Sequence, residues 1–141
     1  MARILIVDDQ SHVRAAILTM LRSKGHEAVG VGEATSAHRE FDAAPFDIAV
    51  VDVYLPGTDG VHLIKELRAK APDLPVIAIS GVTLGHSKQT ALDIFPIAPG
   101  LGDIECLQKP FRVKTLLDSI ERLLRGDDAD VANDLETARP D

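Results

Sequence analysis

Three short runs of consecutive apolar residues, rich in β-branched side chains, recur along the chain at residues 4–7, 48–51 and 76–79. Unbroken apolar character, rather than alternation with polar residues, is typical of strands buried on both faces of a parallel sheet. Two weaker patterns predict further strands at residues 27–31 and 104–108. The hydrophobic pattern therefore predicts five strands.

Apolar residues at helical spacing occupy the segments between these strands. One stripe ends at Gly25, a second ends before Pro72, and a third ends at Gly126, all residue types that stop helices. A weaker pattern predicts a helix over residues 33–41. The stripes consist of Val13, Ile17, Met20 and Leu21; of Val61, Ile64, Leu67 and Ala71; and of Val113, Leu116, Leu117, Ile120, Leu123 and Leu124. A strand followed by a helix, repeated five times, predicts an α/β fold with a doubly wound parallel sheet.

Length and composition are those of one globular domain. The chain has 141 residues, of which 45% are apolar and 26% are charged, as in ordinary soluble proteins. No apolar run approaches the roughly 20 residues that span a membrane, and the strand-like run at residues 4–7 leaves no room for a signal peptide. The only cysteine, Cys106, excludes an intrachain disulfide. We expect a cytoplasmic protein without a membrane partner.

The net charge of −7 is concentrated at the end of the chain. Residues 126–141 carry six acidic side chains and one arginine, which leaves a net charge of about −2 for the rest. Neither part is basic, so we expect no nucleic-acid partner. Because residues 126–141 also lack an apolar pattern, we expect a domain over residues 1–125 and a disordered acidic tail.

Polar residues follow four of the predicted strands at the point where each strand ends. Asp8 and Asp9 follow the first strand, Asp52 the third, Ser80 the fourth and Lys109 the fifth. Ligand sites of doubly wound sheets lie beyond the carboxyl ends of the strands, so we expect these side chains to meet at one edge. Three neighbouring carboxylates repel one another unless a cation lies among them, and Mg²⁺ prefers oxygen ligands. The sequence therefore predicts a Mg²⁺ site.

Such a cluster suits phosphoryl transfer to a carboxylate. A carboxylate can attack phosphorus and form an aspartyl phosphate, and the transfer depends on positioning and on neutralising the phosphoryl oxygens. Mg²⁺, the Lys109 ammonium, and the Ser80 hydroxyl with nearby backbone N–H groups would each meet one of these oxygens.

Four motifs, in this order, resemble the signature of the response regulator receiver family. They are Asp8-Asp9, the segment Asp-Val-Tyr-Leu-Pro-Gly-Thr-Asp-Gly at residues 52–60, Ser80-Gly81 and Lys109-Pro110-Phe111. The likeness covers residues 3 to about 125, and each motif stands at the end of a predicted strand. It implies a flavodoxin-like (βα)5 fold with strand order 2-1-3-4-5.

The resemblance also implies how a metal would be held. Asp52 is similar to the family's phosphoacceptor, which also contacts the metal. Asp9 is similar to the direct Mg²⁺ ligand, with Asp8 acting through water and the Tyr54 carbonyl as a further ligand.

Further implied features concern the phosphoryl group. Lys109 resembles the residue that pairs with this group, usually ahead of a cis peptide to the proline. Ser80 resembles the hydroxyl residue that is drawn toward it on activation. The implied phosphodonor is a phosphohistidine on a sensor histidine kinase or a histidine phosphotransfer protein.

Several of these residues also have structural interpretations. Asp9 can simply cap a helix that begins near Ser11. Pro56-Gly57 is typical of a turn, and Asp59 or Gly60 is expected to start the next helix.

Two departures from the family pattern stand out. Cys106 occupies the position where the family usually has an aromatic residue that takes part in switching, and we interpret it as a small buried strand residue rather than a redox sensor. The segment between Ser80 and Lys109 is longer than usual and rich in proline and glycine. We therefore expect switching by rearrangement or ordering of residues 82–103.

The leading hypothesis is a stand-alone receiver that is not an enzyme beyond its own phosphorylation and dephosphorylation. Its effect would pass through an unidentified protein target, and a homodimer is possible. One alternative is a Mg²⁺-dependent aspartyl-phosphate phosphohydrolase, although Tyr54 stands where such enzymes usually carry a second aspartate. Another is a receiver-like scaffold that binds independently of phosphorylation. A flavin protein is disfavoured because Asp8 and Asp9 would face the flavin phosphate.

Overall fold

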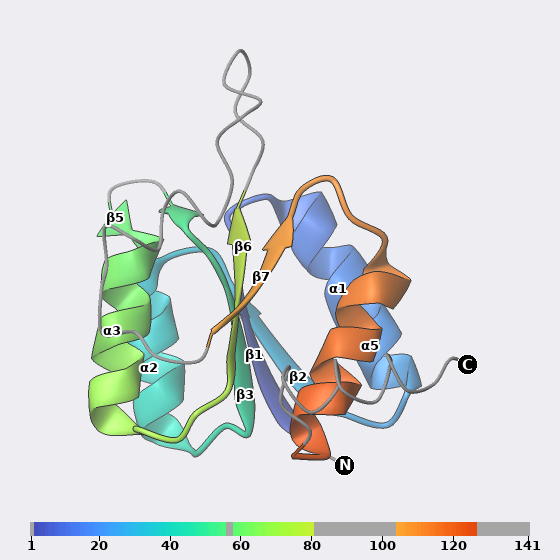
Figure 1. Ribbon diagram of the computed structural model, residues 1–141. Helices are drawn as coiled ribbons and strands as arrows, with labels where there is room; N and C mark the ends of the chain where they lie inside the picture. Colours follow the sequence, from blue (N-terminus) through green and yellow to red (C-terminus); the bar gives the residue numbers. More distant parts are fainter. Residues whose placement is uncertain (1, 56–57, 81–103, 127–141) are drawn as a thin grey trace.

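The computed structural model describes residues 2–55, 58–80 and 104–126. A five-stranded sheet lies between two pairs of helices (Figure 1). The strands of the sheet are β1 (Arg3–Val7), β2 (Glu27–Val31), β3 (Ile48–Asp52), β6 (Val76–Ser80) and β7 (Glu105–Gln108). The helices are α1 (Ser11–Ser23), α2 (Ala34–Ala43), α3 (Gly60–Lys70) and α5 (Val113–Leu124).

The sheet has the order β2-β1-β3-β6-β7, and all neighbouring strands are parallel. Counted by its own strands this order is 2-1-3-4-5, so the doubly wound, flavodoxin-like fold is confirmed. Two further strands, β4 (Tyr54–Leu55) and β5 (Thr58–Asp59), form a separate antiparallel ribbon that the hydrophobic pattern did not predict. The strand order reverses between β1 and β3, so their carboxyl ends border the crevice where such folds bind ligands.

Successive residues of each central strand face opposite sides of the sheet, and both sides are covered by helices. In β1, Leu5 and Val7 pack on the side of α2 and α3, whereas Ile4 and Ile6 pack on the side of α1 and α5. None of the four has exposed surface. Because β3 and β6 repeat this arrangement, the double burial explains the unbroken apolar runs in the sequence.

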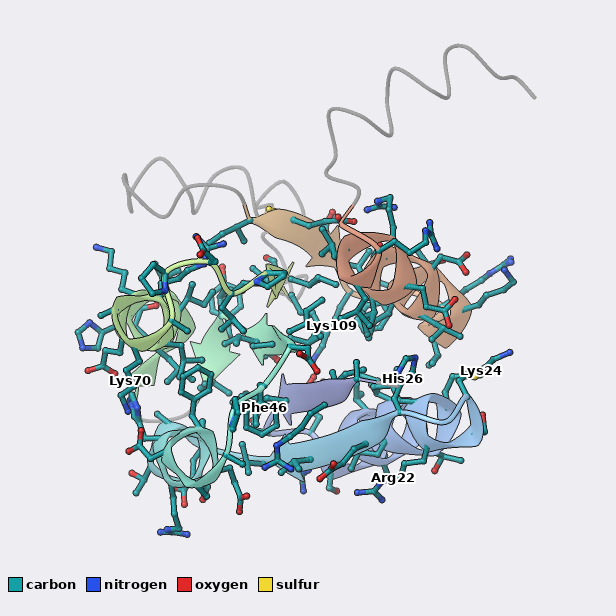
Figure 2. The ribbon with its side chains drawn as sticks, turned by 90° about the horizontal axis from the view of Figure 1, so that it is seen from below. Arg22, Lys24, His26, Phe46, Lys70 and Lys109 are labelled. Carbon is teal, nitrogen blue, oxygen red and sulfur yellow. The ribbon has the colours of Figure 1, made fainter. Side chains whose placement is uncertain are left out.

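An aromatic cluster fixes the start of β3, the strand that ends at the site. The rings of Phe41 and Phe46 stack with centroids 5.9 Å apart, and the Arg3 guanidinium lies 4.4 Å from the centroid of Phe46. Figure 2 shows Phe46 between α2 and the sheet. The backbone N–H of Asp47 donates to the Arg3 carbonyl over 2.8 Å, which ties this cluster to the beginning of β1.

The helix ends follow the expected signals. Gly25 and Gly126, which follow α1 and α5, have positive φ angles of 89° and 85°, a conformation that glycine adopts without strain. No helix within the described ranges is long and apolar enough to cross a membrane. The predicted switch segment at 82–103 and the acidic tail beyond Gly126 lie outside the described residues.

Candidate functional site: an acidic cluster at the strand ends

The carboxyl ends of β1 and β3 bring three aspartates together. The strands pair with Val7 opposite Val51, so Asp8, which follows β1, and Asp52, the last residue of β3, lie at the same level of the sheet. Carboxylate oxygens of Asp8, Asp9 and Asp52 lie within 4.8 Å of one another. Asp8 is fully buried, Asp52 is 3% exposed, and Asp9 is open to solvent. The expected convergence of the three carboxylates is therefore observed.

Two of these aspartates are oriented by backbone N–H groups two residues further along the chain. The N–H of Gln10 donates to Asp8 Oδ1 over 2.9 Å, and the N–H of Tyr54 donates to Asp52 Oδ1 over 2.8 Å. Each bond fixes one carboxylate oxygen and leaves Oδ2 to the cluster. Asp8 Oδ2 is buried, and no contact to it within the described residues has hydrogen-bond geometry. Its nearest cation is the Lys109 ammonium at 3.1 Å, which Asp8 shares with Asp52, so a further cation would complete its pairing.

Lys109, directly after β7, brings positive charge to the aspartates. Its Nζ lies 3.0 Å from Asp52 Oδ2 and 3.1 Å from Asp8 Oδ2, and Figure 2 shows its side chain near the strands. The backbone N–H of Lys109 donates to the Ser80 carbonyl over 2.9 Å, which holds the ends of β6 and β7 together. The peptide bond to Pro110 is cis, as expected. One ammonium is thus shared between two buried carboxylates.

Burial and charge change the acidity of both partners. Burial raises the pKa of Asp52 above its ordinary value, against the lowering effects of the Tyr54 N–H and Lys109, and the Asp8 carboxylate adds to the rise. Burial alone would lower the pKa of Lys109, but the carboxylates of Asp52 and Asp8 hold this pKa above its ordinary value. The site is therefore short of positive charge, as expected for a place that receives a cation.

Ser80 ends β6 at the same edge of the sheet. It is fully buried, and its Oγ has no hydrogen-bond partner among the described residues. In the sheet it comes one residue after Ile79, which pairs with Asp52. A buried hydroxyl without a partner is unfavourable, so Ser80 is well suited to donate to a group that enters the site.

Tyr54 is the remaining predicted metal ligand, and it follows Asp52 by two residues. Tyr54 is 45% exposed, and its backbone N–H orients Asp52. The use of its carbonyl as a metal ligand stays a prediction. Asp9 does not occupy the cap of α1, because the N-cap residue is Gln10. The structural interpretation of Asp9 therefore loses its main support. Asp59 does cap α3, accepting a 2.9 Å hydrogen bond from the N–H of Val61.

Sequence reasoning missed one residue that contacts the site. Gln10 Oε1 accepts a hydrogen bond from Lys109 Nζ over 2.6 Å. A glutamine after a strand is not a recognised signal for a functional residue. The only indication of this contact in the sequence is the position of Gln10 directly after Asp8-Asp9.

Gly60 supports the site through close backbone packing. Its N–H donates to the Val53 carbonyl over 3.0 Å, and an added Cβ would lie 2.4 Å from both the Asp52 carbonyl oxygen and Val53 Cα. Only glycine allows this approach of α3 to the carboxyl end of β3, which carries Asp52.

Cys106 lies on β7 and is half-buried. Burial, with a smaller effect from Glu105, raises the pKa of its thiol to about 11. Because the thiolate is the reactive form, this environment favours the structural interpretation over a redox sensor.

Comparisons with known proteins agree on one family. The model of the response regulator receiver domain matches residues 4–121. The sensory transduction protein RegX3 of Mycolicibacterium smegmatis is 33% identical over 133 residues, which cover 94% of this chain and 55% of that protein. The response regulator receiver protein CpdR of Brucella abortus is 27% identical over 124 residues, which cover 88% of this chain and 98% of that protein.

A solved structure extends this similarity to the fold. The chemotaxis protein CheY4 of Vibrio cholerae superposes with a TM-score of 0.75 at 25% identity, over 86% of this chain and 98% of that chain. This chain spans about half the length of RegX3. The match therefore does not assign the activity of the whole RegX3 protein to this chain.

Gly60→Ala is expected to lower the free energy of unfolding by about 3 kcal/mol, because the new methyl group meets backbone atoms that cannot move aside. Gly32→Ala is the matched control, since its Cβ would meet the end of the Arg14 side chain at 3.2 Å. Urea denaturation of both variants measures the difference, and equal losses would contradict the proposed packing.

Asp52→Asn is expected to stabilise the metal-free protein at about pH 7. A folded-state pKa raised above the reference value of 3.8 means that wild-type stability falls as the pH rises through that pKa. The advantage of the asparagine variant should therefore shrink as the pH is lowered toward about pH 4. Urea denaturation across this range, with a chelator present, tests the expectation, and a variant that is less stable than wild type at neutral pH would contradict it.

Proposed function

The chain belongs to the response regulator receiver domain family, and from this membership we propose that it accepts a phosphoryl group on Asp52. The supporting observation is the shared ion pair: Lys109 Nζ lies 3.0 Å from Asp52 and 3.1 Å from Asp8. The ammonium therefore stands beside the proposed nucleophile, where the charge of a phosphoryl group would arrive. The proposed donor is a phosphohistidine on a sensor histidine kinase or a histidine phosphotransfer protein.

The proposed reaction transfers the phosphoryl group between two side chains. A carboxylate oxygen of Asp52 attacks phosphorus while the bond from phosphorus to the donor imidazole nitrogen breaks, and that nitrogen keeps the electron pair. The hydrogen bond from the Tyr54 N–H to Oδ1 holds the plane of the carboxylate during the approach. Because a phosphoryl group moves without a change of oxidation state, no further reactant is needed.

The chain's own residues would balance the charge of the product. Lys109 would pair with one phosphoryl oxygen, and the buried Ser80 hydroxyl, which lacks a partner, would donate to another. The Asp52 carboxylate loses its negative charge in the acyl phosphate, so Lys109 becomes available for the new group.

We also propose that the acidic cluster holds Mg²⁺. The fit rests on carboxylate oxygens of three aspartates within 4.8 Å of one another. It also rests on Asp8 Oδ2, which is buried, has no contact of hydrogen-bond geometry and shares its single ammonium with Asp52. Asp9 and Asp52 would bind the ion directly, Asp8 through water, with the Tyr54 carbonyl as a further ligand. When bound, the ion neutralises negative charge on the carboxylates and on a phosphoryl oxygen.

The consequence of phosphorylation is proposed to be a change in protein binding. Apart from its own phosphorylation and slow dephosphorylation, the chain would not act as an enzyme. The target is an unidentified protein or a second copy of the chain, in the cytoplasm. Rearrangement or ordering of residues 82–103, a segment outside the described residues, is the proposed switch.

Intact-mass spectrometry after incubation with acetyl phosphate and Mg²⁺ tests the proposed function. The wild-type chain is expected to gain one phosphoryl group, and Asp52→Asn is expected to gain none, because the nucleophile is missing. Asp59→Asn is the matched control: asparagine also caps helices, so α3 is kept and labelling should persist.

Three outcomes would contradict the proposal. Labelling of Asp52→Asn at the wild-type level would place the phosphoryl group elsewhere. Continuous release of phosphate from a generic phosphomonoester would instead favour the phosphohydrolase alternative. Binding to an identified target that is unchanged by labelling and by Asp52→Asn would favour the scaffold alternative.

A further inference from the structure

We propose that Gln10 is a positioning residue for phosphoryl transfer, which holds the Lys109 ammonium beside Asp8 and Asp52. This inference rests on the proposed function of Asp52. It concerns a residue outside the acidic trio, and it follows from the contacts of both the backbone and the side chain of Gln10.

The backbone of Gln10 is fixed on both sides. Its N–H donates to Asp8 Oδ1 over 2.9 Å, and its carbonyl accepts from the N–H of Arg14 over 3.0 Å, in the first turn of α1. The residue is thus joined to the acidic cluster at one end and to a regular helix at the other. A side chain that starts from such a backbone has a defined direction.

The side chain of Gln10 does not cap the helix, although Gln10 is at the N-cap position. Gln10 is the N-cap residue of α1, with φ −85° and ψ 107°, yet its side chain makes no capping hydrogen bond. Serine, threonine, aspartate and asparagine are preferred at N-caps because their short side chains reach the free N–H groups. Here the longer amide extends to Lys109 instead, with Oε1 2.6 Å from Nζ.

The acceptors around Lys109 differ in what happens to them during the reaction. Asp52 Oδ2 at 3.0 Å belongs to the proposed nucleophile, and Asp8 offers Oδ2 at 3.1 Å and Oδ1 at 3.5 Å. Both carboxylates change their charge or partners when a metal ion and a phosphoryl group enter. The neutral amide of Gln10 lies outside the trio, so it can keep its bond to the ammonium throughout.

A hydrogen bond between Gln10 and Lys109 that persists through the reaction should increase the rate of phosphorylation. Lysine has a long, flexible side chain. Without the bond to Gln10, its ammonium could move with the carboxylates that it pairs with or rotate into solvent. A charge-assisted hydrogen bond from a fixed backbone position restricts that motion. Because transfer depends on positioning, loss of the bond should slow phosphorylation while the aspartates themselves remain in place.

Two substitutions separate positioning from folding. Gln10→Met keeps the length of the side chain but removes the acceptor, and Gln10→Ser supplies a helix cap that is too short to reach Lys109. Both are expected to slow labelling by acetyl phosphate at saturating Mg²⁺ by about tenfold. Gln10→Ser should at the same time raise the melting temperature, because it caps α1. A purely structural residue would not give greater stability together with slower transfer.

The measurements are rates of labelling by intact mass, melting temperatures, and the Mg²⁺ dissociation constant from calorimetry. The dissociation constant should change less than about twofold in both variants, because no carboxylate is removed. The control is His12→Ala, an exposed position of α1, whose labelling rate should equal that of wild type. Wild-type labelling with equal or faster rates in both Gln10 variants would overturn this inference and leave the proposed function standing. Absence of labelling on wild-type Asp52 would instead refute the proposed function.

Discussion

Two buried carboxylates share one ammonium, and the organisation of the carboxyl edge of the sheet depends on this imbalance. Asp8 and Asp52 are both removed from water, and Lys109 is close to each of them. Because buried charges are unfavourable unless they are paired, the pairing with a single lysine leaves an excess of negative charge. That excess explains the raised pKa of Lys109 and contributes, with burial, to that of Asp52. A divalent cation is the simplest group that would remove it.

The fold maintains this unfavourable arrangement by fixing the backbone around it. The parallel register sets the ends of β1 and β3 at one level, and N–H groups of the two following loops orient Asp8 and Asp52. The close approach of Gly60 then supports the loop after β3. The large apolar core on both sides of the sheet stabilises the whole domain and so tolerates a strained electrostatic site.

The sequence predicted the sheet and the acidic trio because both follow from strong local signals. Doubly buried strands require unbroken apolar runs, and the polar residues directly after them must lie at the edge. The β4–β5 ribbon was missed because its strands have two residues each, too few for any periodicity. The contact of Gln10 with Lys109 was missed because it joins residues 99 positions apart and depends on a side-chain direction that no residue pattern encodes.

The central claim is that one metal ion and one phosphoryl group fit between these strand ends. A crystal structure of the chain with Mg²⁺ and beryllium fluoride, an analogue of the phosphoryl group, tests it most directly. We expect the analogue on Asp52, the ion among the three aspartates, and both Lys109 Nζ and Ser80 Oγ turned toward the fluorine atoms. An analogue bound elsewhere, or Lys109 still paired with Asp8 beside an empty cluster, would contradict this account.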